Sequence, residues 1–134
     1  MKDPKGEAAR WLAQAEYDLR AAQTNADNEL YAYACFIAQQ AAEKALKAFL
    51  YGQGERHVVG HSVGELCRRA AKGNPAFGKA ATRLGRLDRY YIPTRYPNGL
   101  PSGIPAEVFY ADDAVLALTL ARETLDLVKQ NLNV

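Results

Sequence analysis

The sequence predicts an all-α protein, an antiparallel up-and-down bundle of four to five helices that forms one domain over residues 1–134. Three observations predict this class. Apolar residues recur at helical spacing over long segments, turn-forming residues separate these segments, and no segment shows convincing strand alternation. Hydrophobic residues make up 49% and charged residues 24% of the chain, as in ordinary globular domains. A chain of this length can bury one core without disulfides or metals.

The first two predicted helices are the longest. The first begins at Asp3-Pro4, because Asp suits the N-cap and Pro suits the first turn, and it ends near Ala22, before the turn-forming stretch TNADNE. The second spans about residues 29–51, and its apolar arc is wider than one contact needs, so we expect it at the centre of the bundle. Its narrow polar stripe consists of Gln40, Glu43, Lys44 and Lys47.

Three further helices are predicted after a glycine-containing loop. Ser62 and Glu65 fit a capping box at the start of a short third helix, which ends near residue 72. The fourth spans about residues 75–91, with Tyr91 on its core-facing side. An irregular segment rich in proline and glycine covers about residues 93–109. The last helix begins near Asp112-Asp113, whose charges favour a helix N-terminus, and its surplus of apolar surface indicates a dimer interface.

Composition excludes several classes of function. Cys35 and Cys67 fall on apolar helical positions and are expected to be buried thiols of a reducing compartment. Neither a signal peptide nor a membrane span is visible, so a cytoplasmic protein without membrane association is expected. With two histidines, no H-E-x-x-H spacing and no phosphate-binding loop after a strand, we expect no metal and no cofactor.

Positive charge is concentrated in one third of the chain. Residues 61–100 hold eight basic and two acidic residues, and within them Lys79, Arg83 and Arg86 are expected to form one basic stripe along the fourth helix. Such a segment attracts phosphate-rich partners or is simply a solvated helix face. Arginine donates to phosphate and tyrosine stacks on bases. Arg56 and His61 have the Arg-x4-His spacing of a cation and a base for metal-free RNA cleavage, and whether they act together stays open.

Five segments match one known family in order and spacing: AARWLAQAEYDLRAAQ, YACFIAQQAAEKALKAFLYGQG, HSVGELC, LDRYYIPTRYP and EVFYADDAVLALTLARETLDLV. Over roughly residues 8–130 the sequence therefore resembles the HEPN domain family. The resemblance implies a helical bundle that usually forms a homodimer and is often encoded beside a minimal nucleotidyltransferase as a toxin–antitoxin pair. Many members are metal-independent ribonucleases with an Arg-x(4–6)-His motif near the start of the last long helix.

The chain departs from that motif. Arg95 lies in the region of the family's arginine, but Leu100, Pro101 and Ser102 stand where a histidine is expected. We therefore predict a HEPN-type nucleotide- or RNA-binding protein, with a second copy and a minimal nucleotidyltransferase as expected partners. The alternatives are a ribonuclease toxin with a variant site and a non-catalytic dimerisation or adaptor module. The candidate catalytic residues are Arg95 and His61, and the candidate nucleotide- or RNA-binding residues are Arg86, Arg89, Tyr90, Arg95 and Tyr96.

Overall fold

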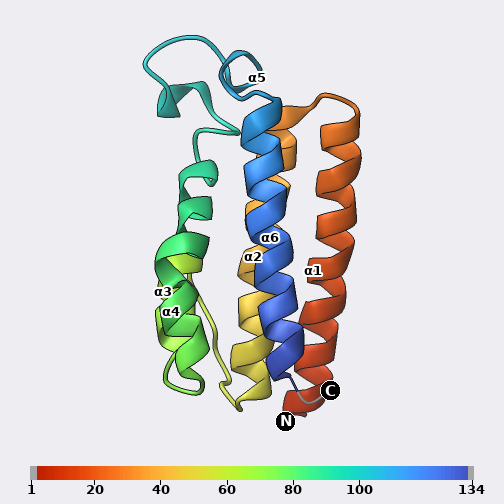
Figure 1. Ribbon diagram of the computed structural model, residues 1–134, viewed down its shortest axis with the longest axis vertical. Coiled ribbons are helices and arrows are strands. Elements are labelled where there is room, and N and C mark those ends of the chain that lie inside the picture. Colours follow the sequence, from red (N-terminus) through yellow and green to blue (C-terminus); the bar gives the residue numbers. More distant parts are fainter. Residues whose placement is uncertain (1–2, 133–134) are drawn as a thin grey trace.

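The computed structural model describes residues 3–132, and this range contains helices and no strand. The α-helices are α1 (Pro4–Asp27), α2 (Tyr31–Gly52), α3 (Val63–Ala70), α4 (Pro75–Leu84), α5 (Pro105–Val108) and α6 (Ala111–Asn131), and the 3-10 helices are η1 (Gly85–Tyr90) and η2 (Pro97–Gly99). The long helices α1, α2 and α6 lie side by side along the bundle, with α3, α4 and η1 beside them (Figure 1). The predicted all-α bundle is thus confirmed.

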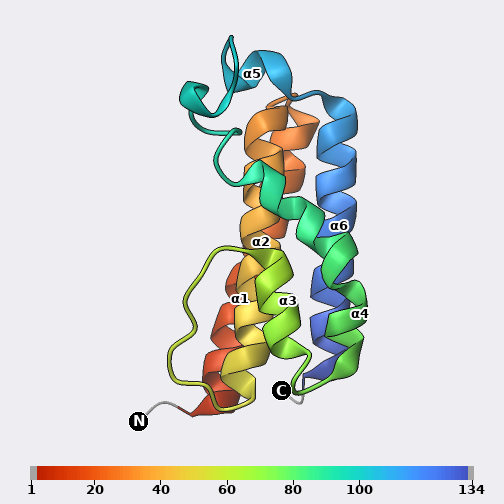
Figure 2. The ribbon, with the colours of Figure 1, turned by 90° about the vertical axis from the view of Figure 1, so that its left-hand side faces the viewer.

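The segment between α2 and α3 determines where the site forms. The chain leaves the end of α2 through Gly54, whose φ of 96° favours glycine. It then runs back along the bundle before α3 begins, as Figure 2 shows. Consequently, α3 runs beside α2 in the same direction, and the up-and-down alternation is interrupted at this point. The residues just before α3 lie against the middle of α2, where the Nε2 of Gln39 donates to the backbone oxygen of His61 at 2.8 Å.

The helix starts that the sequence predicts are confirmed by their capping bonds. Asp3 accepts from the Gly6 amide at 3.0 Å, and Ser62 accepts from the Glu65 amide at 3.1 Å. At the start of α6, the Asp113 carboxylate accepts from the amide of Tyr110 at 2.9 Å. Local side-chain chemistry therefore fixes these three boundaries.

Two predicted boundaries are wrong. The first helix continues past Ala22 to Asp27, and the Asn25 side chain donates to the Ala21 carbonyl inside the helix instead of starting a turn. The fourth helix is α-helical only to Leu84 and continues as the 3-10 helix η1. The tighter turn begins where Gly85 touches α3: a Cβ added at Gly85 would lie 3.2 Å from the Cα of Gly64.

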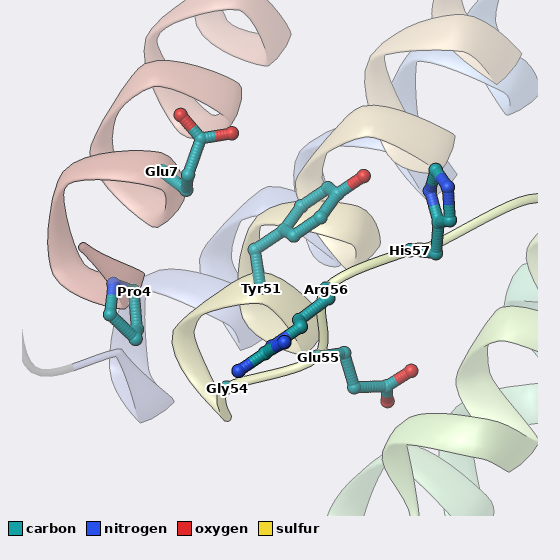
Figure 3. A pocket seen from close by; sticks show the side chains of 7 residues that line it. All are labelled: Pro4, Glu7, Tyr51, Gly54, Glu55, Arg56 and His57. Carbon is teal, nitrogen blue, oxygen red and sulfur yellow. The ribbon is translucent and has the colours of Figure 1, made fainter. Parts of the chain in front are cut away.

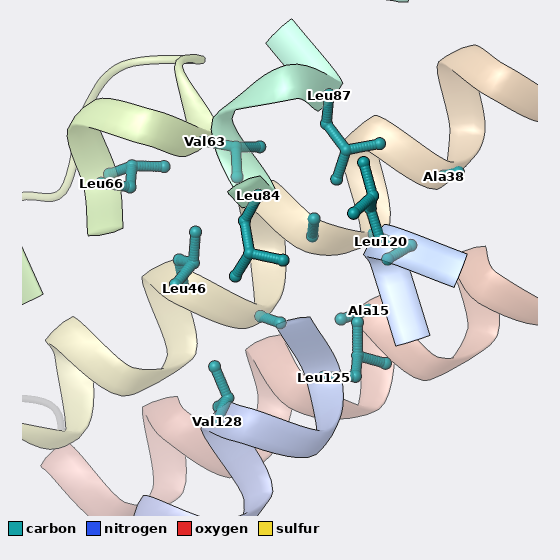
Figure 4. Packing of buried hydrophobic residues seen from close by; sticks show 14 of the residues in the cluster. Ala15, Ala38, Leu46, Val63, Leu66, Leu84, Leu87, Leu120, Leu125 and Val128 are labelled. Atoms are coloured by element: carbon teal, nitrogen blue, oxygen red, sulfur yellow. The ribbon is translucent and has the colours of Figure 1, made fainter. Parts of the chain in front are cut away.

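The core is centred on α2, which contacts α1, α3, α5, α6 and η1. Its alanines are buried and allow the neighbouring helices to approach, while leucine and valine side chains from the other helices fill the space between them (Figure 4). The surplus apolar surface predicted for the last helix is largely consumed inside this chain. Leu120 is buried, Leu116 and Leu127 pack against the core, and Val115 is 64% exposed. The composition of α6 therefore does not indicate a dimer interface.

Candidate functional site

Arg95 lies on a group of aromatic rings near the end of η1. Its guanidinium carbon is 4.2 Å from the ring centroid of Phe36, 4.7 Å from that of Tyr91 and 5.1 Å from that of Tyr96. Its Nε donates to the carbonyl of Tyr91 at 2.9 Å, which fixes the plane of the guanidinium. Within residues 3–132, Arg95 forms no salt bridge, so its charge is stabilised by ring faces and not by a carboxylate.

His61 contacts the same tyrosine. Its ring stacks on Tyr91 with centroids 4.8 Å apart and an interplanar angle of 17°. Its Nδ1 lies 3.3 Å from a carboxylate oxygen of Glu43, and its side chain is 59% exposed. Because Glu43 holds Nδ1, Nε2 is the ring nitrogen that can meet a ligand. We call Phe36, His61, Tyr91, Arg95 and Tyr96 the Arg95 cluster.

The carboxylate that contacts His61 also forms a buried ion pair with Lys47. Glu43 and Lys47 are 4% and 7% exposed, and the Lys47 ammonium lies 3.1 Å from the second oxygen of Glu43. The ammonium also lies 5.8 Å from the ring centroid of Trp11. The polar stripe predicted on α2 is therefore partly buried within the bundle. The sequence could have indicated this burial, because polar residues on a helix expected at the centre of the bundle need hydrogen-bonding or charged partners there.

Asp88 holds the two halves of the site together. Its carboxylate accepts from the Ser62 hydroxyl at 2.7 Å, from the Val63 amide at 2.6 Å and from the Gly64 amide at 3.3 Å. It thereby satisfies the first amides of α3 from the neighbouring η1, as a capping side chain does. This contact brings His61, two residues before α3, close to Tyr91, the residue after η1. In the sequence, Asp88 is only one of the two acidic residues of the basic segment 61–100.

Tyr90, a candidate binding residue, lies in the core, whereas Tyr91, expected on the core-facing side, is partly exposed. Tyr90 is 2% exposed and meets Phe109 edge-on at 6.0 Å, so its ring is not available to stack on a base. Burial raises the pKa of Tyr90 to about 12. Tyr91, expected in the core, is only partly buried. The physical reason is the change to a 3-10 helix at residue 85, because fewer residues per turn rotate the following side chains to other faces.

One arginine of the predicted basic stripe is paired with a carboxylate. Arg83 donates two hydrogen bonds to the carboxylate of Glu123 on α6, with both nitrogen–oxygen distances at 2.7 Å, so its charge is offset. This bond raises the pKa of Arg83 and lowers that of Glu123. Arg86 and Arg89 are exposed on η1. In the part of the chain that the structure describes, no hydrogen bond, ion pair or ring contact joins them to the Arg95 cluster.

Arg56 and His61 lie in different places. Arg56 lines a pocket of about 590 Å³ with Pro4, Tyr51 and His57, beside the first turn of α1 (Figure 3). His61 lies at the other end of the same loop, against Glu43 and Tyr91. The structure brings His61 to Arg95 instead, through their shared contact with Tyr91.

Two further properties of the described residues concern metal binding and membrane insertion. Among the described residues, no three histidine, cysteine, aspartate or glutamate side chains are grouped in a way that would hold a metal ion. Across residues 3–132, every helix is too short or too polar to span a bilayer.

Comparisons with known proteins agree with the fold. The model of the HEPN domain family matches residues 8–131. A crystallised protein of Thermus thermophilus is 39% identical with a TM-score of 0.83, over 94% of this chain and 98% of that one. An archaeal HEPN homologue is 36% identical with a TM-score of 0.74, over 98% of each chain. A HEPN domain protein of Thermotoga maritima, 24% identical over 90% of this chain and 95% of its own, shares the fold with a TM-score of 0.62. None of the curated proteins searched matches the chain.

Proposed function

The chain belongs to the HEPN domain family, and on that premise we propose that it binds nucleotides or RNA at the Arg95 cluster. One observation carries the proposal: a guanidinium without a carboxylate partner in residues 3–132 lies on three aromatic rings, beside a histidine that shares one of them. Arginine in such a setting keeps planar donors for phosphate, and aromatic faces accept bases.

Each residue of the cluster has a part in this proposal. Arg95 contacts a phosphate, and Tyr96, which is 50% exposed, stacks on a base. His61 meets the ribose or the adjoining phosphate through Nε2. Arg86 and Arg89 attract the polyanion from the exposed side of η1 without direct contact to the cluster. Tyr90 takes no part, because its ring is buried.

Binding is tested by fluorescence anisotropy with a labelled short RNA at moderate salt. Arg95→Ala should weaken binding by about tenfold or more, because a hydrogen bond to a charged group contributes roughly 1.5–3 kcal/mol. Arg10→Ala is the matched control: Arg10 is an exposed arginine in the first half of α1, paired with Glu7. Equal affinity of wild type and Arg95→Ala would contradict the assignment of Arg95.

A second function, metal-independent ribonuclease activity, is favoured by the contact between Glu43 and His61. A buried carboxylate that holds Nδ1 orients the ring so that Nε2 can remove a proton from a 2′-hydroxyl. The 2′-oxygen then attacks phosphorus, the bond to the 5′-oxygen breaks, and that oxygen takes a proton from the protonated histidine. Arg95 stabilises the charge that develops on the phosphate.

Cleavage is tested with pure protein and RNA in the presence of a chelator. Wild type should produce fragments ending in a cyclic phosphate, and His61→Ala should not. RNA that stays intact after prolonged incubation with wild type would leave binding as the function of this site.

We also propose that the protein acts in the cytoplasm as a homodimer, paired with a minimal nucleotidyltransferase in a toxin–antitoxin-like system. Family membership supports this pairing. Light scattering should give twice the chain mass, and co-expression with a neighbouring nucleotidyltransferase gene should yield a complex. A complex that forms without any RNA binding by the Arg95 cluster would favour the adaptor alternative.

A further inference from the structure

A second cavity lies beside Arg95, where the proline-containing loop folds back on the start of α2. Its volume is about 250 Å³, and its lining includes Tyr31, Tyr33, Thr94, Arg95, Pro97 and Ile104. In Figures 1 and 2, the loop and α5 lie at the same end of the bundle as the turn between α1 and α2. Arg95 therefore belongs both to the lining of this cavity and to the exposed Arg95 cluster.

The lining is mostly apolar and carries one cation, Arg95, and one carboxylate, Glu29. Tyrosine rings come from the first turn of α2, and proline and isoleucine side chains come from the loop. Thr94 is 1% exposed, and its hydroxyl donates to the Tyr90 carbonyl at 2.5 Å, so this polar group is already satisfied. A planar group with apolar faces and N–H donors at its edge, joined to an anion that lies on Arg95, matches this arrangement, because Glu29 can accept from those donors.

The size of the cavity restricts the ligand further. At about 250 Å³, it is smaller than the clefts of roughly 300–1,000 Å³ that hold drug-sized molecules. One heterocycle fits this description, whereas a base pair or two stacked bases do not. A base enters such a pocket only after it leaves its stack, and this costs least in a single strand.

We propose that this pocket receives one unpaired nucleobase, whose phosphate lies on Arg95, and that the protein thereby selects single-stranded over duplex nucleic acid. The inference rests on the proposed function, because the phosphate contact at Arg95 is what brings the base to the pocket. It adds a base subsite that shares Arg95 with the Arg95 cluster, and a preference for unpaired strands.

The test blocks the pocket without touching Arg95. Ala106 lines the pocket from α5 and is exposed, so Ala106→Trp fills the entrance without entering the core. Ala9→Trp, at an exposed position of α1, is the matched control. Tyr33→Ala is a second variant, which removes a wall from a side chain that is 56% exposed.

Each variant is titrated with three kinds of labelled RNA probe: a single strand, the same strand in a duplex, and a series of single strands that each carry one abasic position at a different nucleotide. Wild type should bind the single strand more tightly than the duplex. Ala106→Trp and Tyr33→Ala should weaken single-strand binding by about 5- to 150-fold, the range for loss of one stacked base, and should leave duplex binding unchanged. Ala9→Trp should behave as wild type.

The results separate this inference from the proposed function. If wild type binds none of the probes, the proposed function and the base pocket both fail. If wild type binds in an Arg95-dependent way but Ala106→Trp binds the single strand equally well or better, only the base pocket is overturned. Equal affinity of wild type for every abasic probe and for the intact strand would overturn it as well.

Discussion

Replacement of Glu43 tests whether the buried pair beneath His61 stabilises the protein, positions the histidine, or does both. Glu43→Gln preserves the shape of the side chain and removes its charge. The Lys47 ammonium, 3.1 Å away on a residue that is 7% exposed, then loses its counter-ion. Removing one partner of a buried ion pair costs about 3–5 kcal/mol. We expect about 3 kcal/mol, because Lys47 keeps its contact with the Trp11 ring, worth roughly 0.5–1 kcal/mol.

A double variant separates stability from positioning. Glu43→Leu with Lys47→Met replaces both charges by apolar side chains of similar volume, a change that is often neutral or stabilising. The free energy of unfolding should therefore return close to that of wild type. In both variants His61 loses the carboxylate that holds its Nδ1, so RNA binding and any cleavage should stay reduced even in the stable double variant.

The assay is urea unfolding followed by fluorescence. The single tryptophan, Trp11, stacks on Tyr51 at 5.4 Å and lies near Lys47, so its emission reports on this region. A Glu43→Gln protein within about 0.5 kcal/mol of wild type, the range of ordinary surface substitutions, would refute the energetic argument. A double variant with wild-type RNA affinity and cleavage would refute the positioning role of Glu43.

Three further predictions concern Asp88, the two buried cysteines and the ion pair between Arg83 and Glu123. Asp88→Ala should lower the free energy of unfolding by about 1–3 kcal/mol in urea titrations, because the first amides of α3 lose their acceptor, and a wild-type midpoint would contradict this. Burial raises the pKa of Cys35 and of Cys67 to about 12, so at neutral pH a thiol reagent should react slowly with native protein and rapidly after unfolding. Arg83→Ala should lose the stabilisation that the lowered pKa of Glu123 provides. The difference in free energy of unfolding between wild type and variant should be present at neutral pH. It should vanish as the pH falls below the ordinary value of 4.5 and through the lowered pKa, in acid titrations followed by circular dichroism.

The sequence by itself determined the fold class and most helix boundaries, because these depend on neighbours in the chain. Apolar spacing identified α2 as the central helix, and short-range capping at Asp3 and Ser62 marked where helices begin. It also singled out Arg95 and His61, which the structure brings to one tyrosine ring, although their roles stay predictions.

Only the tertiary structure decided how the site is assembled. Contact between Gly64 and Gly85 accompanies the change to a 3-10 helix, which buries Tyr90 and leaves Tyr91 for His61 and Arg95. The return of the chain along α2 places His61 on Glu43, a residue that periodicity assigned to an ordinary polar stripe. These contacts join residues far apart in the sequence, so they depend on packing between helices, which local propensity and spacing do not encode.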